Sequence, residues 1–170
     1  MASKTSLTEN QSGTERLQGK YLTFQLAKQE YGLEILKVKE IIGIMEITIL
    51  PRTPDYVKGV INLRGKVIPV IDLRLRFGLD EIDYTEKTCI IVVEITENGT
   101  KLQKGIIVDA VSEVLYVSSE EIEPTPRFGV SINTEYILGM AKSKAGVITL
   151  LDVDKVLVSE DVEEIIESME

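Results

Sequence analysis

Acidic side chains are the most frequent chemistry-bearing groups in this chain, and they gather in two clusters, at residues 80–83 and 120–123. Neighbouring carboxylates can work as a general acid and base pair or hold a metal ion. Both clusters lie in polar segments, and neither has the spacing of a calcium-binding loop. We therefore predict solvated surface carboxylates, with no metal site and no cofactor.

The chain contains no histidine and a single cysteine, Cys89. Without histidine, the Ser-His-Asp and Cys-His schemes of nucleophilic catalysis are excluded, as are zinc sites that need imidazole. Cys89 lies in an apolar segment without an activating base, which predicts a core thiol in a reducing compartment. Phosphate-binding glycine loops are absent from the sequence as well. We predict that the chain is not an enzyme.

The net charge is -9, and acidic residues are concentrated at the C-terminal end, where no basic residue follows Ser159. An acidic chain repels nucleic acid and anionic membrane surfaces. No apolar run is long enough to span a bilayer, and the N-terminus lacks the apolar core of a signal peptide. These features predict a cytoplasmic protein with no nucleic-acid partner and no direct membrane contact.

Short runs rich in valine and isoleucine, bounded by Gly, Asn and Pro, indicate β-strands. The predicted strands are 21–26, 31–36, 59–63, 66–71, 88–96, 101–108, 113–117, 136–142 and 146–151. Arg64-Gly65 and Asn98-Gly99 suit two-residue hairpin turns. The fold is predicted to be mainly antiparallel β.

Helical signals are few. Asp72 and Asp152 are placed to cap short helices over 73–77 and 153–157. Apolar residues recur at helical spacing near the C-terminus, which predicts an acidic amphipathic helix over 159–170. Residues 1–19 are rich in Ser, Thr, Gln and Gly and are predicted to form a disordered lead.

An internal repeat divides the chain into two similar halves. Gly32 aligns with Gly105 at a shift of 73 residues, and the matches continue in order through the next strand. Farther along the shift becomes 80, where Gly59 aligns with Gly139 and Asp72 aligns with Asp152. The repeat predicts two similar small β-barrels of common origin.

The densest motif of the chain is Gly59-Val-Ile-Asn-Leu-Arg-Gly65, followed by Pro69 and by Asp72-Leu-Arg74. It resembles the signature of the CheW-like domain family of chemotaxis coupling proteins, and the resemblance extends over residues 20–158. That resemblance implies two interlocked, five-stranded, SH3-like barrels, which agrees with the repeat.

The resemblance also implies a function. Members of the family are non-enzymatic adaptors that couple the cytoplasmic tips of chemoreceptors to the regulatory domain of the chemotaxis histidine kinase, and so control kinase activity and array assembly. The positions that match the family's receptor-binding region are Val38, Glu40, Gly59, Asn62, Arg64, Gly65 and Ile90. Those that match its kinase-binding region are Glu123, Arg127, Phe128, Val67, Ile68 and Val70.

Two alternatives stay open from the residues alone. The first is a β-barrel that senses a small ligand or carries a weak enzymatic activity, which would require a closed pocket with convergent polar groups. The second is a coupling domain that inhibits the kinase by occupying its site. For Arg64, the competing interpretation is a surface arginine that only pairs with Glu40 and adds little stability.

Overall fold

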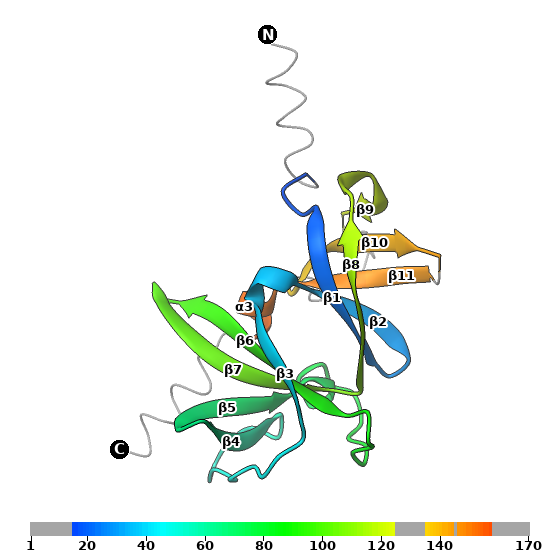
Figure 1. The fold of residues 1–170 in the computed structure, drawn as a ribbon. Coiled ribbons are helices and arrows are strands. Elements are labelled where there is room, and N and C mark those ends of the chain that lie inside the picture. The colour runs from blue at the N-terminus through cyan, green and yellow to red at the C-terminus, as the bar shows by residue number, and fades with distance from the viewer. Residues whose placement is uncertain (1–14, 125–134, 145, 158–170) are drawn as a thin grey trace.

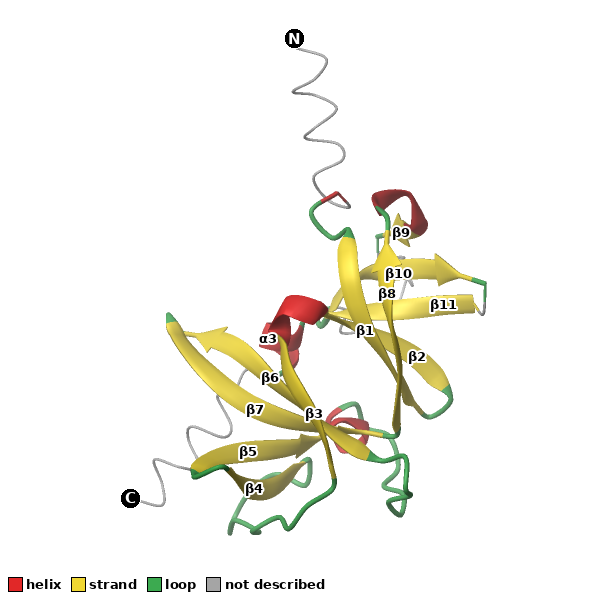
Figure 2. Ribbon diagram, in the orientation of Figure 1, coloured by secondary structure: helices red, strands yellow, loops and turns green. Residues whose placement is uncertain are grey.

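The computed structural model describes residues 15–124, 135–144 and 146–157. Its strands are β1 (Gly19–Leu26), β2 (Gln29–Glu34), β3 (Val38–Gly43), β4 (Val57–Leu63), β5 (Lys66–Asp72), β6 (Cys89–Glu97), β7 (Thr100–Val108), β8 (Ala110–Val117), β9 (Ile122–Glu123), β10 (Ile137–Ser143) and β11 (Gly146–Leu151). Its short helices are η1 (Ile35–Lys37), α2 (Leu73–Arg76), η2 (Ser119–Glu121) and α3 (Val153–Val156). Figure 2 shows how strongly strands dominate.

The strands form two strongly curved sheets at opposite ends of the molecule, with α3 between them (Figure 1). One sheet has the order β8-β1-β2-β11-β10-β9, and we call it barrel 1. The other has the order β3-β6-β7-β5-β4, and we call it barrel 2. The predicted double barrel is therefore confirmed, although the two-residue β9 gives barrel 1 a sixth strand.

The barrels exchange hairpins. The β1-β2 hairpin of the first half belongs to barrel 1, together with β8 to β11 of the second half. The β6-β7 hairpin of the second half belongs to barrel 2, together with β3 to β5 of the first. Each hairpin joins its host through a parallel seam, β2 with β11 and β5 with β7. Neither half can complete a barrel alone, so the predicted interlocking is confirmed.

The two barrels match in register as well as in strand order. Val92 opposes Glu40 across the β3-β6 pair, where the ladder shifts by one residue between Val38 and Glu40. In the β1-β8 pair the same irregularity lies between Leu22 and Phe24. Because β-bulges are built into a fold rather than accidental, their shared position supports a common plan for the halves.

Equivalent glycines line the two parallel seams. A Cβ atom added at Gly32 would lie 3.0 Å from Cδ2 of Leu150, and one added at Gly105 would lie 2.8 Å from Cγ2 of Ile90. A larger residue at Gly32 would press on Leu150 of β11 across the seam, whereas one at Gly105 would press on Ile90 of β6, inside barrel 2. The 73-residue repeat of glycine noted in the sequence therefore marks where the exchanged hairpins pack.

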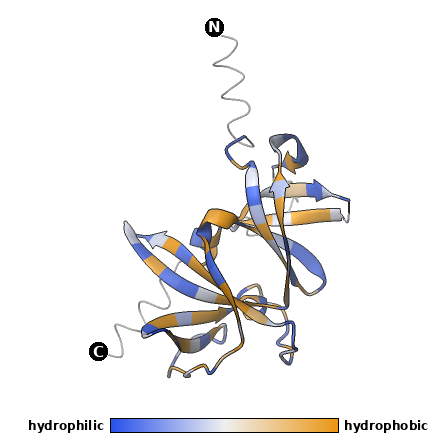
Figure 3. Cartoon of the chain, in the orientation of Figure 1, coloured by the Kyte–Doolittle hydropathy of each residue, from blue (hydrophilic) through white to orange (hydrophobic). Residues whose placement is uncertain are grey.

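Three apolar clusters fill the interior. The largest contains residues of both barrels, including Phe24 and Leu33 from barrel 1 and Val57 and Ile91 from barrel 2. A smaller cluster fills barrel 1 around Tyr21, and a third fills barrel 2. Hydropathy alternates along many of the strands, as expected when one face of a sheet is buried (Figure 3). The shared cluster makes the barrels one folding unit.

Most predicted elements are present, with ends shifted by one to three residues. The Asp72 carboxylate accepts hydrogen bonds from the backbone N–H groups of Arg74 and Leu75, and that of Asp152 accepts one from Lys155, so both predicted caps are confirmed. The strands β3 and β9 were not predicted. Among the described residues, no helix is both long enough and apolar enough to cross a bilayer.

The predictions for the two ends of the chain have different outcomes. The predicted disordered lead over 1–19 is too long at its C-terminal end, because Leu17 is buried in the barrel 1 cluster and Gly19 begins β1. Leucine anchors the segment there, although its neighbours are polar. The predicted C-terminal helix over 159–170 lies outside the described residues.

Gly59 gives a test of this packing. Its φ is +140°, and an added Cβ would lie 2.0 Å from the backbone oxygen of Thr48, so alanine fits neither the backbone nor the space. We predict that Gly59→Ala lowers the free energy of unfolding by about 2–4 kcal/mol, measured by urea denaturation. Gly43→Ala is the matched control, since a Cβ at Gly43 meets nothing within 4 Å. Equal effects at both positions would contradict the steric argument.

Candidate functional site: an exposed turn and a hollow between the barrels

The two carboxylate clusters are surface features. Glu81 pairs with Lys58, Glu123 lies 2.7 Å from the ammonium group of Lys142, and Glu121 belongs to the capping box of η2. Hydrogen bonds from Ser118 lower the pKa of the Glu121 carboxyl. No group of acidic or cysteine side chains in residues 15–124, 135–144 and 146–157 is arranged to hold a metal ion.

Cys89 is half-buried at the start of β6. Burial raises the pKa of its thiol, so the nucleophilic thiolate is disfavoured at neutral pH. The environment of Cys89 is therefore that of a packing residue and not that of an activated nucleophile.

The strongest candidate from the sequence, Arg64, sits on the tight turn between β4 and β5. Arg64 and Gly65 have φ values of +53° and +84°, and the N–H of Gly65 donates to Oδ1 of Asn62 over 2.9 Å. This left-handed pair is the geometry of a type I′ hairpin turn. Asparagine or glycine would adopt the first position at lower cost than arginine. The arginine is thus placed there in spite of local backbone preference.

The Arg64 side chain is well exposed and makes an ion pair with Glu40 of β3. Because β3 and β4 are the two end strands of the barrel 2 sheet, the pair joins the edges of the barrel. We call Glu40, Asn62, Arg64 and Gly65 the turn surface. A hydrogen-bonding arginine on an exposed turn can meet a partner's carboxylate without rearranging the fold.

The other three predicted receptor-binding residues do not reach this surface. Ile90 is fully buried in the barrel 2 core, Gly59 is buried against Thr48, and Val38 is partly buried against the shared cluster. The prediction of direct contact is wrong for Ile90 and Gly59, because both face the interior. Their roles are to support β3 and β4, which carry Glu40 and Arg64.

The predicted kinase-binding residues divide in the same way. Val67 is 68% exposed on β5, and Glu123 is exposed at the end of β9. Ile68 and Val70 are buried in the barrel 2 cluster, so direct contact is wrong for these two side chains. They follow the inward face of β5, which sequence alone could not distinguish from the outward face. Arg127 and Phe128 lie outside the described residues.

Val67 and Asn62 are direct partners across the β4-β5 hairpin. Side chains at such positions lie within about 5.5 Å of one another at Cβ. A residue predicted to face the kinase is therefore adjacent to the turn surface, whereas Glu123 belongs to the other barrel. Of the predicted kinase-binding residues that the structure describes, the two exposed ones thus belong to different barrels.

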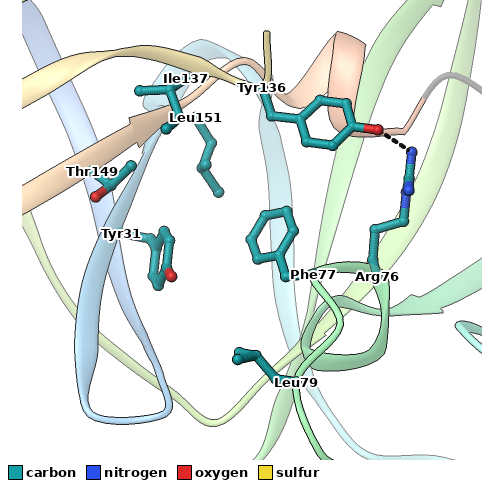
Figure 4. Close-up of a pocket in the computed structure, with 8 residues that line it drawn as sticks. All are labelled: Tyr31, Arg76, Phe77, Leu79, Tyr136, Ile137, Thr149 and Leu151. Atoms are coloured by element: carbon teal, nitrogen blue, oxygen red, sulfur yellow. Dashed lines mark hydrogen bonds between the residues drawn. The ribbon is translucent and has the colours of Figure 1, made fainter. Parts of the chain in front are cut away.

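A hollow of about 400 Å³ lies between the two halves of the molecule. Figure 4 shows aromatic side chains around it, with Phe77 between Tyr31 and Tyr136. The lining comprises Tyr31, Arg76, Phe77, Leu79, Tyr136, Ile137, Thr149 and Leu151. The ring centroids are 5.9 Å apart for Tyr31 and Phe77, and 6.5 Å apart for Phe77 and Tyr136. None of these residues was among the predicted receptor- or kinase-binding positions.

Arg76 holds the halves together beside this hollow. Its guanidinium carbon is 4.9 Å from the ring centroid of Tyr56 and 5.0 Å from that of Tyr136, residues that are equivalent at the shift of 80. Nε donates to the backbone oxygen of Val156 over 3.1 Å, and Nη2 donates to the Tyr136 hydroxyl over 2.7 Å. Val156 is itself the repeat equivalent of Arg76. One arginine therefore lies where the two halves meet.

Two further ion pairs lie at equivalent places, with their charges reversed. Arg74 of α2 lies 2.6 Å from Oδ2 of Asp109, just after β7. Its repeat equivalent in α3 is Asp154, which lies 2.7 Å from Nζ of Lys37, just after β2. The hydrogen bond from Lys37 to Asp154 raises the pKa of the lysine. Each ion pair links a short helix, α2 or α3, to the segment that follows an exchanged hairpin.

Glu34, at the end of β2, is the carboxylate with the least favourable surroundings on this face. Burial raises its pKa, and Asp152 and Asp154 add to the effect while Lys37 opposes it. Burial and the nearby Glu34 together raise the pKa of Tyr21 to about 12, and the tyrosine hydroxyl donates to the backbone oxygen of Leu17. Tyr21 and Glu34 are partners in the β1-β2 ladder, and Tyr21 packs in the barrel 1 core. No nucleophile lies beside them among the described residues.

Fold and site together define a double barrel with exposed turns and exposed apolar side chains. Comparison with known proteins assigns this double barrel to a family. The model of the CheW-like domain matches residues 20–161. Chemotaxis protein CheW of Klebsiella aerogenes is 42% identical over 141 residues, covering 83% of this chain and 82% of that protein. Chemotaxis protein CheW of Bacillus subtilis is 35% identical over 139 residues, covering 81% and 86%.

A solved structure agrees with these relatives. The scaffolding protein TtCheW from Thermoanaerobacter tengcongensis superimposes with a TM-score of 0.73 at 39% identity, over 84% of this chain and 94% of that one. The chain belongs to the CheW-like domain family. It is a chemotaxis adaptor or scaffold protein.

Sequence reasoning missed the hollow and the arginine beside it. The repeat contained a usable signal, because Tyr56 and Tyr136 align at the same shift as Asp72 and Asp152. Arg76 carried no such signal, since its repeat equivalent is a valine and only the assembled halves bring it between the two rings.

Arg76 offers a second test. We predict that Arg76→Leu lowers the free energy of unfolding by about 2–4 kcal/mol, because it removes two charge-assisted hydrogen bonds and two ring contacts. Arg76→Lys should recover only part of this, since an ammonium cannot stack as a planar guanidinium does. Urea denaturation provides the measurement, with the exposed Lys66→Ala as control. A leucine variant as stable as the control would rule out a role in joining the halves.

Proposed function

We propose that the chain couples chemoreceptor cytoplasmic tips to the regulatory domain of the chemotaxis histidine kinase, with the turn surface as its receptor contact. The observation that carries this proposal is the conformation of Arg64. A β-hairpin turn needs no arginine in the left-handed position, and the residue aligned with Arg64 in the second half is Lys144. An exposed residue retained against backbone preference points to recognition.

The ion pair with Glu40 supplies the specificity. Arg64 is exposed enough to exchange this partner for a carboxylate on a receptor helix, and the released Glu40 can then meet a basic group of the same helix. Neither side chain has to be pulled out of the core. Contacts of this kind are modest and reversible, which suits a scaffold shared by many receptors.

The kinase contact is assigned to Val67 on barrel 2 and to Glu123 on barrel 1. Val67 is one of the most exposed large apolar side chains of the described residues, and exposed apolar groups of this kind mark interfaces. Val67 is paired with Asn62, so the two proposed contacts would lie side by side on barrel 2. Binding of one partner would then influence binding of the other.

The same proposal includes a cytoplasmic location and no catalytic role. Glu81 and Glu123 of the two acidic clusters form ion pairs, and burial raises the pKa of the Cys89 thiol, and both observations favour a non-catalytic role. The hollow between the barrels is open to solvent and its arginine is already bonded, which makes it unlike the closed ligand pocket that a sensing barrel requires.

Charge reversal tests the receptor contact. We predict that Arg64→Glu weakens binding of a receptor-tip fragment at least tenfold while leaving the unfolding midpoint unchanged, because the side chain is exposed and its ion pair adds little stability. Isothermal titration calorimetry measures the affinity, and Lys66→Glu is the matched control two residues away. Unchanged affinity in Arg64→Glu would show that the arginine only pairs with Glu40.

A second substitution separates the two contacts. We predict that Val67→Asp weakens binding of the kinase regulatory domain at least tenfold, because a charge replaces an apolar contact, and changes receptor-fragment affinity less than threefold. Val147→Asp is the control, since Val147 is the repeat equivalent on barrel 1 and is 54% exposed. If receptor binding fell as much as kinase binding, Val67 would belong to the turn surface.

A further inference from the structure

Barrel 1 contains a second hollow, apart from the one beside Arg76. It has a volume of about 300 Å³ and is lined by Thr23, Glu30, Ser112, Glu113, Leu115, Ser143, Lys144 and Ile148. It lies at the turn between β10 and β11, between that turn and β8. The repeat equivalent of this place on barrel 2 is the turn surface, because Lys144 corresponds to Arg64 and Glu113 corresponds to Glu40.

Register supports the equivalence residue by residue. Thr23 exchanges two hydrogen bonds with the backbone of Glu113, at the bulge that barrel 2 has at Glu40. The β10-β11 hairpin pairs Ser143 with Gly146, as the β4-β5 hairpin pairs Leu63 with Lys66. Ser143 therefore stands where barrel 2 has Leu63.

The difference between Leu63 and Ser143 contributes to the hollow. In barrel 2, Leu63 packs against the apolar cluster and Arg64 pairs with Glu40 beside it. In barrel 1 the corresponding side chain is a serine, whose hydroxyl turns back to the oxygen of Gly146 over 3.3 Å. The apolar floor, provided by Leu115 and Ile148, has no leucine above it. The missing leucine leaves open part of the space of about 300 Å³.

The charges around the opening are mainly negative. Glu30 accepts hydrogen bonds from Ser112 and Gln25, which hold its carboxylate in place. The backbone of Glu113 is fixed by Thr23, and Lys144 is the one cation among the described residues of the lining. Two carboxylates against one ammonium favour an approaching basic group.

We propose that this hollow is a docking site for a protein segment that presents a leucine followed by an arginine, with the leucine on Leu115 and Ile148 and the guanidinium on Glu113. Barrel 2 supplies the template, since its own Leu63-Arg64 pair fills the equivalent space and meets the equivalent glutamate. A second copy of this chain cannot insert that pair, because Leu63 is already packed in its own barrel. The proposal is independent of the receptor and kinase assignments.

The test uses the full chain, labelled with nitrogen-15, and a head-to-tail cyclised peptide with the sequence of residues 59–68. Cyclisation holds the Leu-Arg pair in its turn and limits the entropy lost on binding. We expect saturable chemical-shift changes below about 2 mM peptide, confined to the backbone amides of Thr23, Ser112, Glu113 and Ser143. A peptide in which the leucine is replaced by serine should bind at least tenfold more weakly.

Two variants of the protein complete the experiment. Ser143→Leu restores the side chain found in barrel 2, so it should abolish peptide binding and leave the unfolding midpoint equal or higher. Glu113→Lys should weaken binding at least tenfold, with the bond between Thr23 and the Glu113 backbone preserved. The absence of saturable binding, shifts that map elsewhere, or binding retained by Ser143→Leu would each overturn the proposal.

Discussion

The whole structure depends on the two parallel seams at which each hairpin joins the barrel of the opposite half. Backbone pairing along β2-β11 and β5-β7 requires the hairpins to approach closely, and glycine at position 32 allows that approach along β2-β11. Parallel pairing of this kind normally needs a long crossover connection. Here α2 and β6 connect β5 to β7, and the strands β3 to β10 connect β2 to β11, so barrel 2 lies within the second connection and the barrels are inseparable.

The halves share a plan, but their differences carry the chemistry. Arg76 meets Val156, its own equivalent, and the ion pairs of α2 and α3 have opposite polarity. The turn of barrel 2 is packed and closed by an arginine, and the turn of barrel 1 is open. The two halves thus share their strand register and their core, whereas the turn at Arg64 and the turn at Lys144 differ.

The sequence predicted the fold well where the signal was local or repeated. Strand alternation, the Asp72 and Asp152 caps and the Arg64-Gly65 turn all depend on residues a few positions apart. The site was predicted less well. Ile68 and Val70 lie on the inward face of β5, and alternation does not state which face meets the core until the strand partners are known; Ile90 lies in a stretch of β6 that is buried on both faces. The hollows arise from residues of both halves, so no single segment encodes them.

Hairpin exchange also sets the order in which the protein can assemble while it is being synthesised. The strands of barrel 2 end at Val108, so that barrel can close once this residue has left the ribosome. The β1-β2 hairpin emerges first, yet its partners β8 to β11 emerge last. The N-terminal hairpin must therefore wait for its seam partner β11, which is complete only when Leu151 appears. This waiting hairpin is the part of the nascent chain with the longest exposure to chaperones and to misassembly.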